Sequence, residues 1–190
     1  MLRHVNSFIF PDSIIKEMKN KIKETRKKKI ELGFSLCTEK DSNVVVRGSE
    51  CIGTECSIKV GKCKEEQKYI GNYHTHPRGP ASLSTADMIT GCSEDIECVG
   101  AASFNNMRCF TRKTGTYRCL SETMPFREDE EKVLERSLRI SSAVKNPTQI
   151  LRMGVPQFLR ELKQHDKEIG EYYKNRLMLL NKNFDRTNIS

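Results

Sequence analysis

Tyr73-His74-Thr75-His76-Pro77 ends an apolar segment of the chain, and Ser84 and Asp87 follow it closely. Side chains alternate across a strand, so His74 and His76 project from the same face where this strand ends. Ser84 and Asp87 are three residues apart at the start of a predicted helix, which places them on one helical face. The pattern therefore predicts that four polar side chains meet beside the end of one strand.

Two imidazoles and one carboxylate form a ligand set for a divalent cation, most simply zinc. A catalytic zinc site of this kind binds histidine nitrogen and carboxylate oxygen and keeps one position open for water. We therefore predict that His74, His76 and Asp87 hold Zn2+, which lowers the pKa of water toward about 7. A carboxylate base is still needed nearby, and Ser84 is placed to donate a hydrogen bond to an oxyanion.

Each of these residues also has a plainer interpretation when it is taken alone. A His-x-His pair is often found on a surface strand. Ser84 is a natural helix N-cap, and Asp87 favours the positive end of the helix dipole. It is the combination at this spacing that indicates a metal site.

The region before the histidines predicts a helix and then a strand. Apolar residues recur at helical spacing after Pro11, and the segment ends in Arg26-Lys27-Lys28-Lys29, where cations suit a helix C-terminus. Residues 30–37 place an apolar residue at every second position, which predicts a strand with one buried face. Glu31 lies on the other face, beside Gly33. From the strand alone, Glu31 is either an exposed charge or a placed catalytic group.

The remaining segments predict more strands and then a change of architecture. Strands are expected over residues 5–10, 44–46, 98–104 and 107–112, the last in a hairpin with residues 116–120. After Pro125 the chain is highly charged, and its apolar residues have helical spacing. We therefore divide the chain into a first domain over residues 1–122 and a helical C-terminal extension over residues 123–190.

The sequence His74-Thr75-His76, seven residues and Ser84-x-x-Asp87 resembles the complete motif of the JAMM (MPN+) zinc metalloproteases. This family also carries a glutamate on the strand after its first helix, close to a glycine, and Glu31-Leu32-Gly33 is similar to that position. The resemblance covers residues 5–120. Two departures, Leu32 for a glycine and Leu83 for a proline, do not involve a predicted ligand.

The resemblance implies a fold, a mechanism and a substrate class. The fold is α+β with a cytidine-deaminase-like JAMM/MPN core, a mixed and mainly antiparallel sheet flanked by helices. In the implied mechanism, His74, His76 and Asp87 hold zinc, Glu31 is the general base and Ser84 stabilises the tetrahedral intermediate. The implied activity is a deubiquitinase-like isopeptidase or peptidase acting on an amide bond to a ubiquitin-like modifier or related small protein. A small peptide or cysteine conjugate is a further substrate class for the same site.

Charge leads to a different functional hypothesis. The chain has 33 Lys and Arg against 25 Asp and Glu, and residues 1–30 alone hold nine against three. A basic excess suits acidic partners such as nucleic acid, although charge runs also cover ordinary solvated helices. The alternative to an enzyme is therefore an assembly or nucleic-acid-associated protein that uses the JAMM fold as a scaffold. Nucleobase deaminases, which use Cys-x-x-Cys, are set aside because the chain has no such pair.

Cysteine usage and hydropathy bear on the compartment. No apolar run approaches the ~20 residues that span a bilayer, and the first residues lack the layout of a signal peptide, so we expect a cytoplasmic protein without membrane contact. The eight cysteines are many for such a protein. They are open to three interpretations: buried thiols, disulfides or ligands of a second metal.

Overall fold

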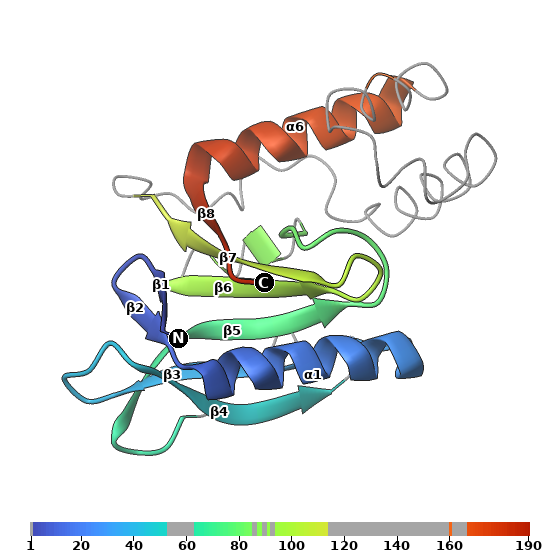
Figure 1. The fold of residues 1–190 in the computed structure, drawn as a ribbon. Coiled ribbons are helices and arrows are strands. Elements are labelled where there is room, and N and C mark those ends of the chain that lie inside the picture. The colour runs from blue at the N-terminus through green and yellow to red at the C-terminus, as the bar shows by residue number, and fades with distance from the viewer. Residues whose placement is uncertain are drawn as a thin grey trace. The chain divides into compact units, whose positions relative to one another are not determined.

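A computed structural model describes residues 2–52, 63–84, 87, 88, 91, 94–113, 160 and 167–190. The chain divides into two compact units (Figure 1). The first contains Met1–Ser121 together with Asn183–Ser190, and the second contains Glu122–Lys182. The division into a domain over residues 1–122 and an extension over residues 123–190 stays a prediction. The last eight residues of the chain belong to the first unit.

The first unit is built on a six-stranded sheet with the order β4-β3-β5-β6-β7-β8. All neighbouring strands are antiparallel except β5 and β6, which are parallel. The architecture is therefore mixed α+β with a mainly antiparallel sheet, as predicted. The strands are β3 (Leu32–Glu39), β4 (Val45–Ile52), β5 (Gln67–His76), β6 (Ile96–Ala101), β7 (Asn106–Arg112) and β8 (Phe184–Asn188).

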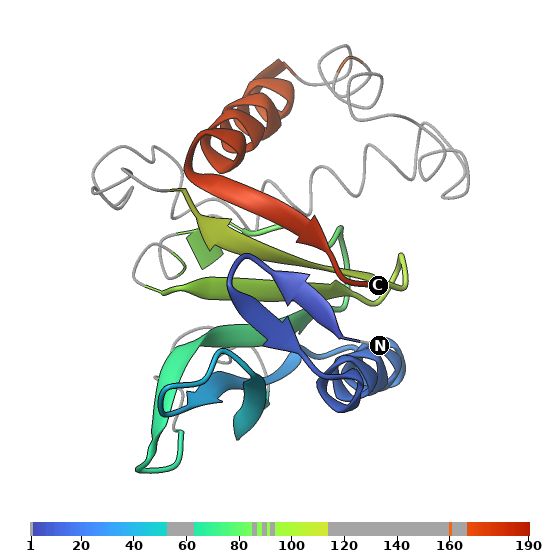
Figure 2. The same cartoon turned by 60° about the vertical axis from the view of Figure 1, so that its left-hand side comes forward.

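Helix α1 (Asp12–Lys28) covers one face of this sheet (Figures 1 and 2). Pro11 precedes its first turn, and Lys29 ends it in a left-handed conformation. Its apolar stripe packs on the sheet, and the Tyr73 hydroxyl donates to the Met18 carbonyl at 2.8 Å. The buried residues that the helix contributes to this core are Ile14, Ile15, Met18 and Ile22. The face of the sheet opposite α1 is the one that carries His74 and His76.

Two short strands precede α1, where the sequence predicted one. β1 (Arg3–Val5) pairs with β2 (Phe8–Phe10) in a small antiparallel hairpin. Asn6 takes a positive φ of 54° in the turn, a conformation that asparagine tolerates better than most residues. The Arg3 guanidinium donates to the Ser190 carbonyl, which places the hairpin beside the residues that follow β8 (Figure 2).

The edge of the sheet is formed by a strand from the far end of the sequence. β8 pairs with β7 over Arg108–Arg112, on the side of β7 that β6 does not occupy. The sequence predicts a hairpin of β7 with residues 116–120, which lie outside the described residues. Helix α6 (Lys167–Asn183) of the second unit leads directly into β8. It confirms a helix within the predicted helical extension, most of which lies outside the described residues.

Four of the cysteines form two disulfides. Cys98 and Cys109 lie opposite each other on β6 and β7, and Cys37 of β3 is bonded to Cys63. For these four residues, disulfides are therefore the correct choice among the three predicted alternatives. No helix in the described part of the chain is long and apolar enough to cross a membrane.

Candidate metal centre

The end of β5 sends alternate side chains to opposite faces of the sheet. Thr75 faces α1, where its hydroxyl contacts the Thr25 hydroxyl at 2.5 Å. His74 and His76 therefore point to the other face, as period-two alternation predicts. Their rings lie 4.9 Å apart between centroids. Thr75 therefore attaches the strand to the helix on one face of the sheet, while His76 projects from the opposite face.

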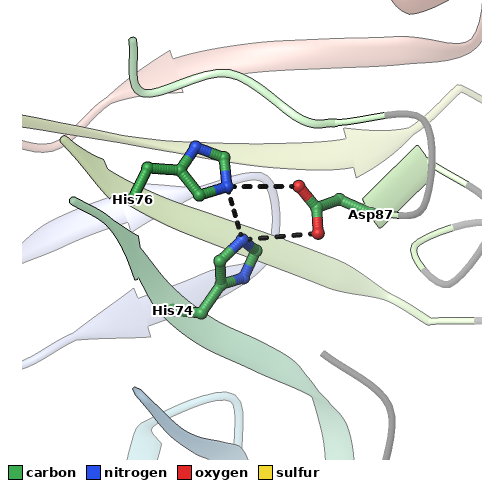
Figure 3. Close-up of side chains that lie close together, drawn as sticks. All are labelled: His74, His76 and Asp87. Carbon is green, nitrogen blue, oxygen red and sulfur yellow. Dashed lines mark hydrogen bonds and ion pairs between the residues drawn. The ribbon is translucent and has the colours of Figure 1, made fainter. Parts of the chain in front are cut away.

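His74, His76 and Asp87 converge on one point (Figure 3). Nε2 of His74 lies 3.1 Å from Nε2 of His76, and each of these nitrogens lies 3.4 Å from an Asp87 carboxylate oxygen. Ligand atoms of a tetrahedral zinc, at their usual bond lengths, lie about 3.3 Å from one another. The three side chains therefore fit a single small divalent cation and could hold one.

Ser84 and Asp87 form a reciprocal capping pair. The Asp87 N–H donates to Ser84 Oγ at 3.0 Å, and the Ser84 N–H donates to Asp87 Oδ2 at 2.7 Å. The Met88 N–H donates to the Ser84 carbonyl at 3.0 Å, which begins a helical turn. Ser84 is therefore an N-cap, and the cap also aims the Asp87 carboxylate at the histidines. The Ser84 hydroxyl accepts in this cap and keeps its own proton for donation.

Glu31 lies immediately before β3 and close to the same cluster. The Thr75 hydroxyl accepts from the Leu32 N–H and donates to the Leu32 carbonyl, both at 3.0 Å, so the chain beside Glu31 is fastened to β5. Burial raises the pKa of the half-buried Glu31 carboxyl, while His74 and His76 oppose that rise through their charges. The structure thus brings Glu31 within electrostatic reach of the histidines.

The close approach of β3 and β5 explains why a glycine, Gly33, lies two residues after Glu31. Gly33 lies opposite His74 in the β3–β5 ladder. A Cβ on Gly33 would lie 2.2 Å from the Tyr73 carbonyl oxygen and 3.0 Å from the His74 Cα. Only glycine permits this close approach of the two strands, so the residue has a structural reason at the site that needs no role in catalysis.

Sequence reasoning missed one polar residue of the site. Glu97 on β6 is 3% exposed, and its Oε1 lies 2.8 Å from His74 Nδ1. His76 Nδ1 faces the Pro80 carbonyl at 3.3 Å. Each imidazole therefore has an acceptor beside Nδ1, which leaves Nε2 directed at the point of convergence. The only sequence signal for Glu97 was a charge within an otherwise apolar and small-residue strand.

The buried charges of the site act strongly on one another. Burial disfavours a charged His74, but Asp87 and then Glu97 outweigh it and hold the pKa of His74 well above its ordinary value. Burial likewise disfavours a charged Asp87, and His74 outweighs it, so the pKa of Asp87 lies well below its ordinary value. The carboxylate is therefore ionised and ready to bind a cation, whereas the imidazole must first lose a proton.

Comparison with known proteins gives no family assignment. No protein-family model matches the chain, and no curated protein sequence matches it. The chemical interpretation therefore depends on the described side chains and on the motif that carries them.

Proposed function

We propose that this protein is a zinc-dependent isopeptidase or peptidase of the JAMM type. It would hydrolyse an amide bond to a ubiquitin-like modifier or a related small protein. The observation that carries the proposal is the convergence of His74, His76 and Asp87, with Glu31 within electrostatic reach of all three. The mixed, mainly antiparallel sheet is compatible with a JAMM core.

The residues of the site would have three roles: binding the metal, transferring a proton and donating a hydrogen bond. His74, His76 and Asp87 would hold the metal, which when bound supplies Lewis acidity and lowers the pKa of water toward about 7. Glu31 accepts a proton from the attacking water and returns it to the leaving amine, a role favoured by its raised pKa. The Ser84 hydroxyl donates a hydrogen bond to the oxygen that becomes negative as the carbonyl is attacked.

Glu31→Gln tests the proposal directly. Glutamine keeps the shape of the side chain and cannot carry the proton, so we expect zinc binding to be retained and turnover to fall about 10²–10⁴-fold. Glu66→Gln, in an exposed turn before β5, is the matched control and should leave both unchanged. Zinc content is measured by atomic spectroscopy, and turnover with isopeptide-linked and linear fusions of ubiquitin-like modifiers.

Three results would count against the proposal. A purified wild type that takes up no zinc would remove the metal centre. A zinc-loaded wild type that cleaves none of these fusions would remove the substrate class, and cleavage of short peptides or cysteine conjugates would then be measured. Unchanged turnover in Glu31→Gln would remove Glu31 from the mechanism.

A second candidate function follows from the outer surface of α1. Lys16, Lys19, Lys23 and Lys27 recur at helical spacing and are all exposed. Within the described part of the chain, none of these four pairs with a carboxylate, whereas Lys28 pairs with Glu24. We call these four residues the lysine ridge. Such a ridge suits the phosphates of a nucleic acid, which is the assembly or nucleic-acid-associated alternative.

The lysine ridge is tested by fluorescence anisotropy with labelled DNA and RNA. Lys19→Gln with Lys23→Gln should weaken binding and flatten its dependence on salt, because fewer counterions are released. Lys40→Gln with Lys64→Gln removes the same charge from exposed positions elsewhere and should change neither. Binding that does not depend on salt, or no binding by the wild type, would exclude this candidate.

A further inference from the structure

Glu97 reaches the metal centre from the strand beside the histidines. In the parallel β5–β6 ladder it lies opposite Asn72, two residues before His74 and on the same face of the sheet. Its Oε1 is 2.8 Å from His74 Nδ1, and both side chains are almost completely buried. An ionised carboxylate only accepts hydrogen bonds, so with Glu97 ionised the donor in this contact is the N–H at Nδ1 of His74.

A hydrogen on Nδ1 decides which nitrogen is available to a metal. With Nδ1 donating to Glu97, the lone pair of His74 Nε2 is left for the cation, and Nε2 is the atom that faces His76 and Asp87. A carboxylate behind a histidine ligand fixes the ring and makes the ligand more basic. We propose that Glu97 is a positioning residue that holds His74 in its metal-binding orientation. This inference rests on the metal centre of the proposed function.

Glu94, whose charge acts on Glu97, makes its own contacts with β5. Its Oε1 accepts from the Tyr69 hydroxyl at 2.5 Å and from Asn72 Nδ2 at 3.0 Å. The Oε2 atoms of Glu94 and Glu97 are both buried, and neither has a hydrogen-bond partner in the described part of the chain. The Glu97 carboxyl is therefore held through its Oε1 atom, by the contact with His74 Nδ1 at 2.8 Å.

A bulge in β5 makes these contacts of Glu94 possible. In the β3–β5 ladder Leu36 lies opposite Gly71 and Cys37 opposite Tyr69, so one extra residue is inserted in β5. Without it, alternation would turn Tyr69 to the face of α1 and away from Asn72. With it, Tyr69 and Asn72 both reach Glu94. The bulge therefore brings these contacts and the histidines to one face.

The test measures zinc affinity by competition with a chromophoric chelator at one pH and at a temperature where circular dichroism shows every variant folded. Glu97→Ala removes the acceptor behind His74 and should weaken zinc binding about 10–100-fold. Glu97→Gln keeps an oxygen that can accept from Nδ1, so its loss should be smaller. Glu94→Gln is the matched control, because it makes the same carboxyl-to-amide change at a nearby residue and keeps an oxygen that accepts from Tyr69 and Asn72. It should bind zinc nearly as the wild type does.

A second readout follows the His74 ring itself. In the zinc-loaded wild type, NMR should show a slowly exchanging Nδ1–H proton of His74, which Glu97→Ala should lose and Glu94→Gln should keep. Equal zinc affinity in Glu97→Ala and the wild type would overturn the proposal and leave the proposed function intact. If Glu97→Ala does not fold, an affinity of Glu97→Gln equal to that of Glu94→Gln overturns it. A wild type that binds no zinc overturns the metal centre, and with it both proposals.

Discussion

His74 decides how the site responds to acidity. Asp87 and Glu97 raise its pKa and so favour a protonated imidazole in the absence of a cation, and the proposed zinc ion would have to displace that proton. Asp87, with a lowered pKa, is already ionised and releases none. We therefore predict that zinc affinity rises with pH, by about tenfold per pH unit, until the raised pKa of His74 is passed.

Calorimetry in two buffers of different ionisation enthalpy checks this prediction. It should show about one proton released per zinc bound at neutral pH. An affinity that does not change between about pH 6 and pH 8 would mean that His74 is already neutral. That result would contradict the electrostatic description of the site.

Ser84 has two possible contributions, and two substitutions separate them. Ser84→Ala removes both the N-cap and the hydroxyl, so it should cost about 1 kcal/mol of unfolding free energy and about 10²-fold or more in turnover. Ser84→Gly also removes the hydroxyl, but glycine caps a helix nearly as well. We expect Ser84→Ala and Ser84→Gly to lose the same amount of turnover. Only Ser84→Gly should keep a stability near that of the wild type. If turnover follows stability instead, Ser84 is a cap alone.

Some elements could be predicted from the sequence because their signals are local. The apolar stripe of α1, the strand that ends at His76 and the Ser84–Asp87 pair can each be recognised from residues that are close together in the sequence. β8 could not be predicted, since it follows a helical segment directly and its pairing with β7 spans a long stretch of chain. Glu97 was missed for the same reason: its partner His74 is supplied by a neighbouring strand and not by its own.

The bulge in β5 depends on Gly71, which gives a prediction at the level of the strand. Gly71 has a φ of 152°, and a Cβ there would lie 1.7 Å from the Ile96 carbonyl oxygen. Backbone atoms of β6 cannot move aside without breaking the parallel pairing, so Gly71→Ala should cost about 3 kcal/mol or more. Gly79 also has a positive φ, of 88°, but nothing lies within 4 Å. Gly79→Ala should therefore cost only about 1–2 kcal/mol, and denaturant unfolding measures both.

If the two glycine variants lose the same stability, the close approach at Gly71 is not what limits the strand. The difference between them also bears on the metal centre. Gly71 separates Tyr69 from Asn72 and His74 along β5, so a strand that straightens would lose the contacts of Glu94 before those of the histidines.

At the level of the molecule, the two disulfides bear on where the protein functions. Both lie in the first unit, at Cys37–Cys63 and Cys98–Cys109. Disulfides are rare in reducing compartments, with hyperthermophiles as the main exception. The cytoplasmic location therefore stays a prediction that these bridges do not support by themselves.

The last strand of the sheet, β8, follows β7 only after a long stretch of chain that contains the second unit. Folding and zinc binding can therefore be tested in the first unit without the second. β8 closes the edge of β7, and Phe184 of β8 and Ile189, which follows it, are buried. The Lys113 N–H donates to the Asn183 carbonyl at 2.9 Å. We predict that replacing residues 122–182 with a short Gly/Ser linker leaves a cooperatively folded protein that still binds zinc. Deleting residues 183–190 should instead destabilise the first unit by several kcal/mol, because each buried apolar side chain contributes about 1.5–3 kcal/mol.

Thermal unfolding and zinc stoichiometry of the two variants measure this difference. A linker variant that unfolds without cooperativity would show that the first unit needs the second one to fold. A linker variant that folds and binds zinc, but no longer cleaves a substrate of the full chain, would assign Glu122–Lys182 to substrate recognition. The metal centre would then be a property of the first unit alone, since every residue that builds it lies between Glu31 and Glu97.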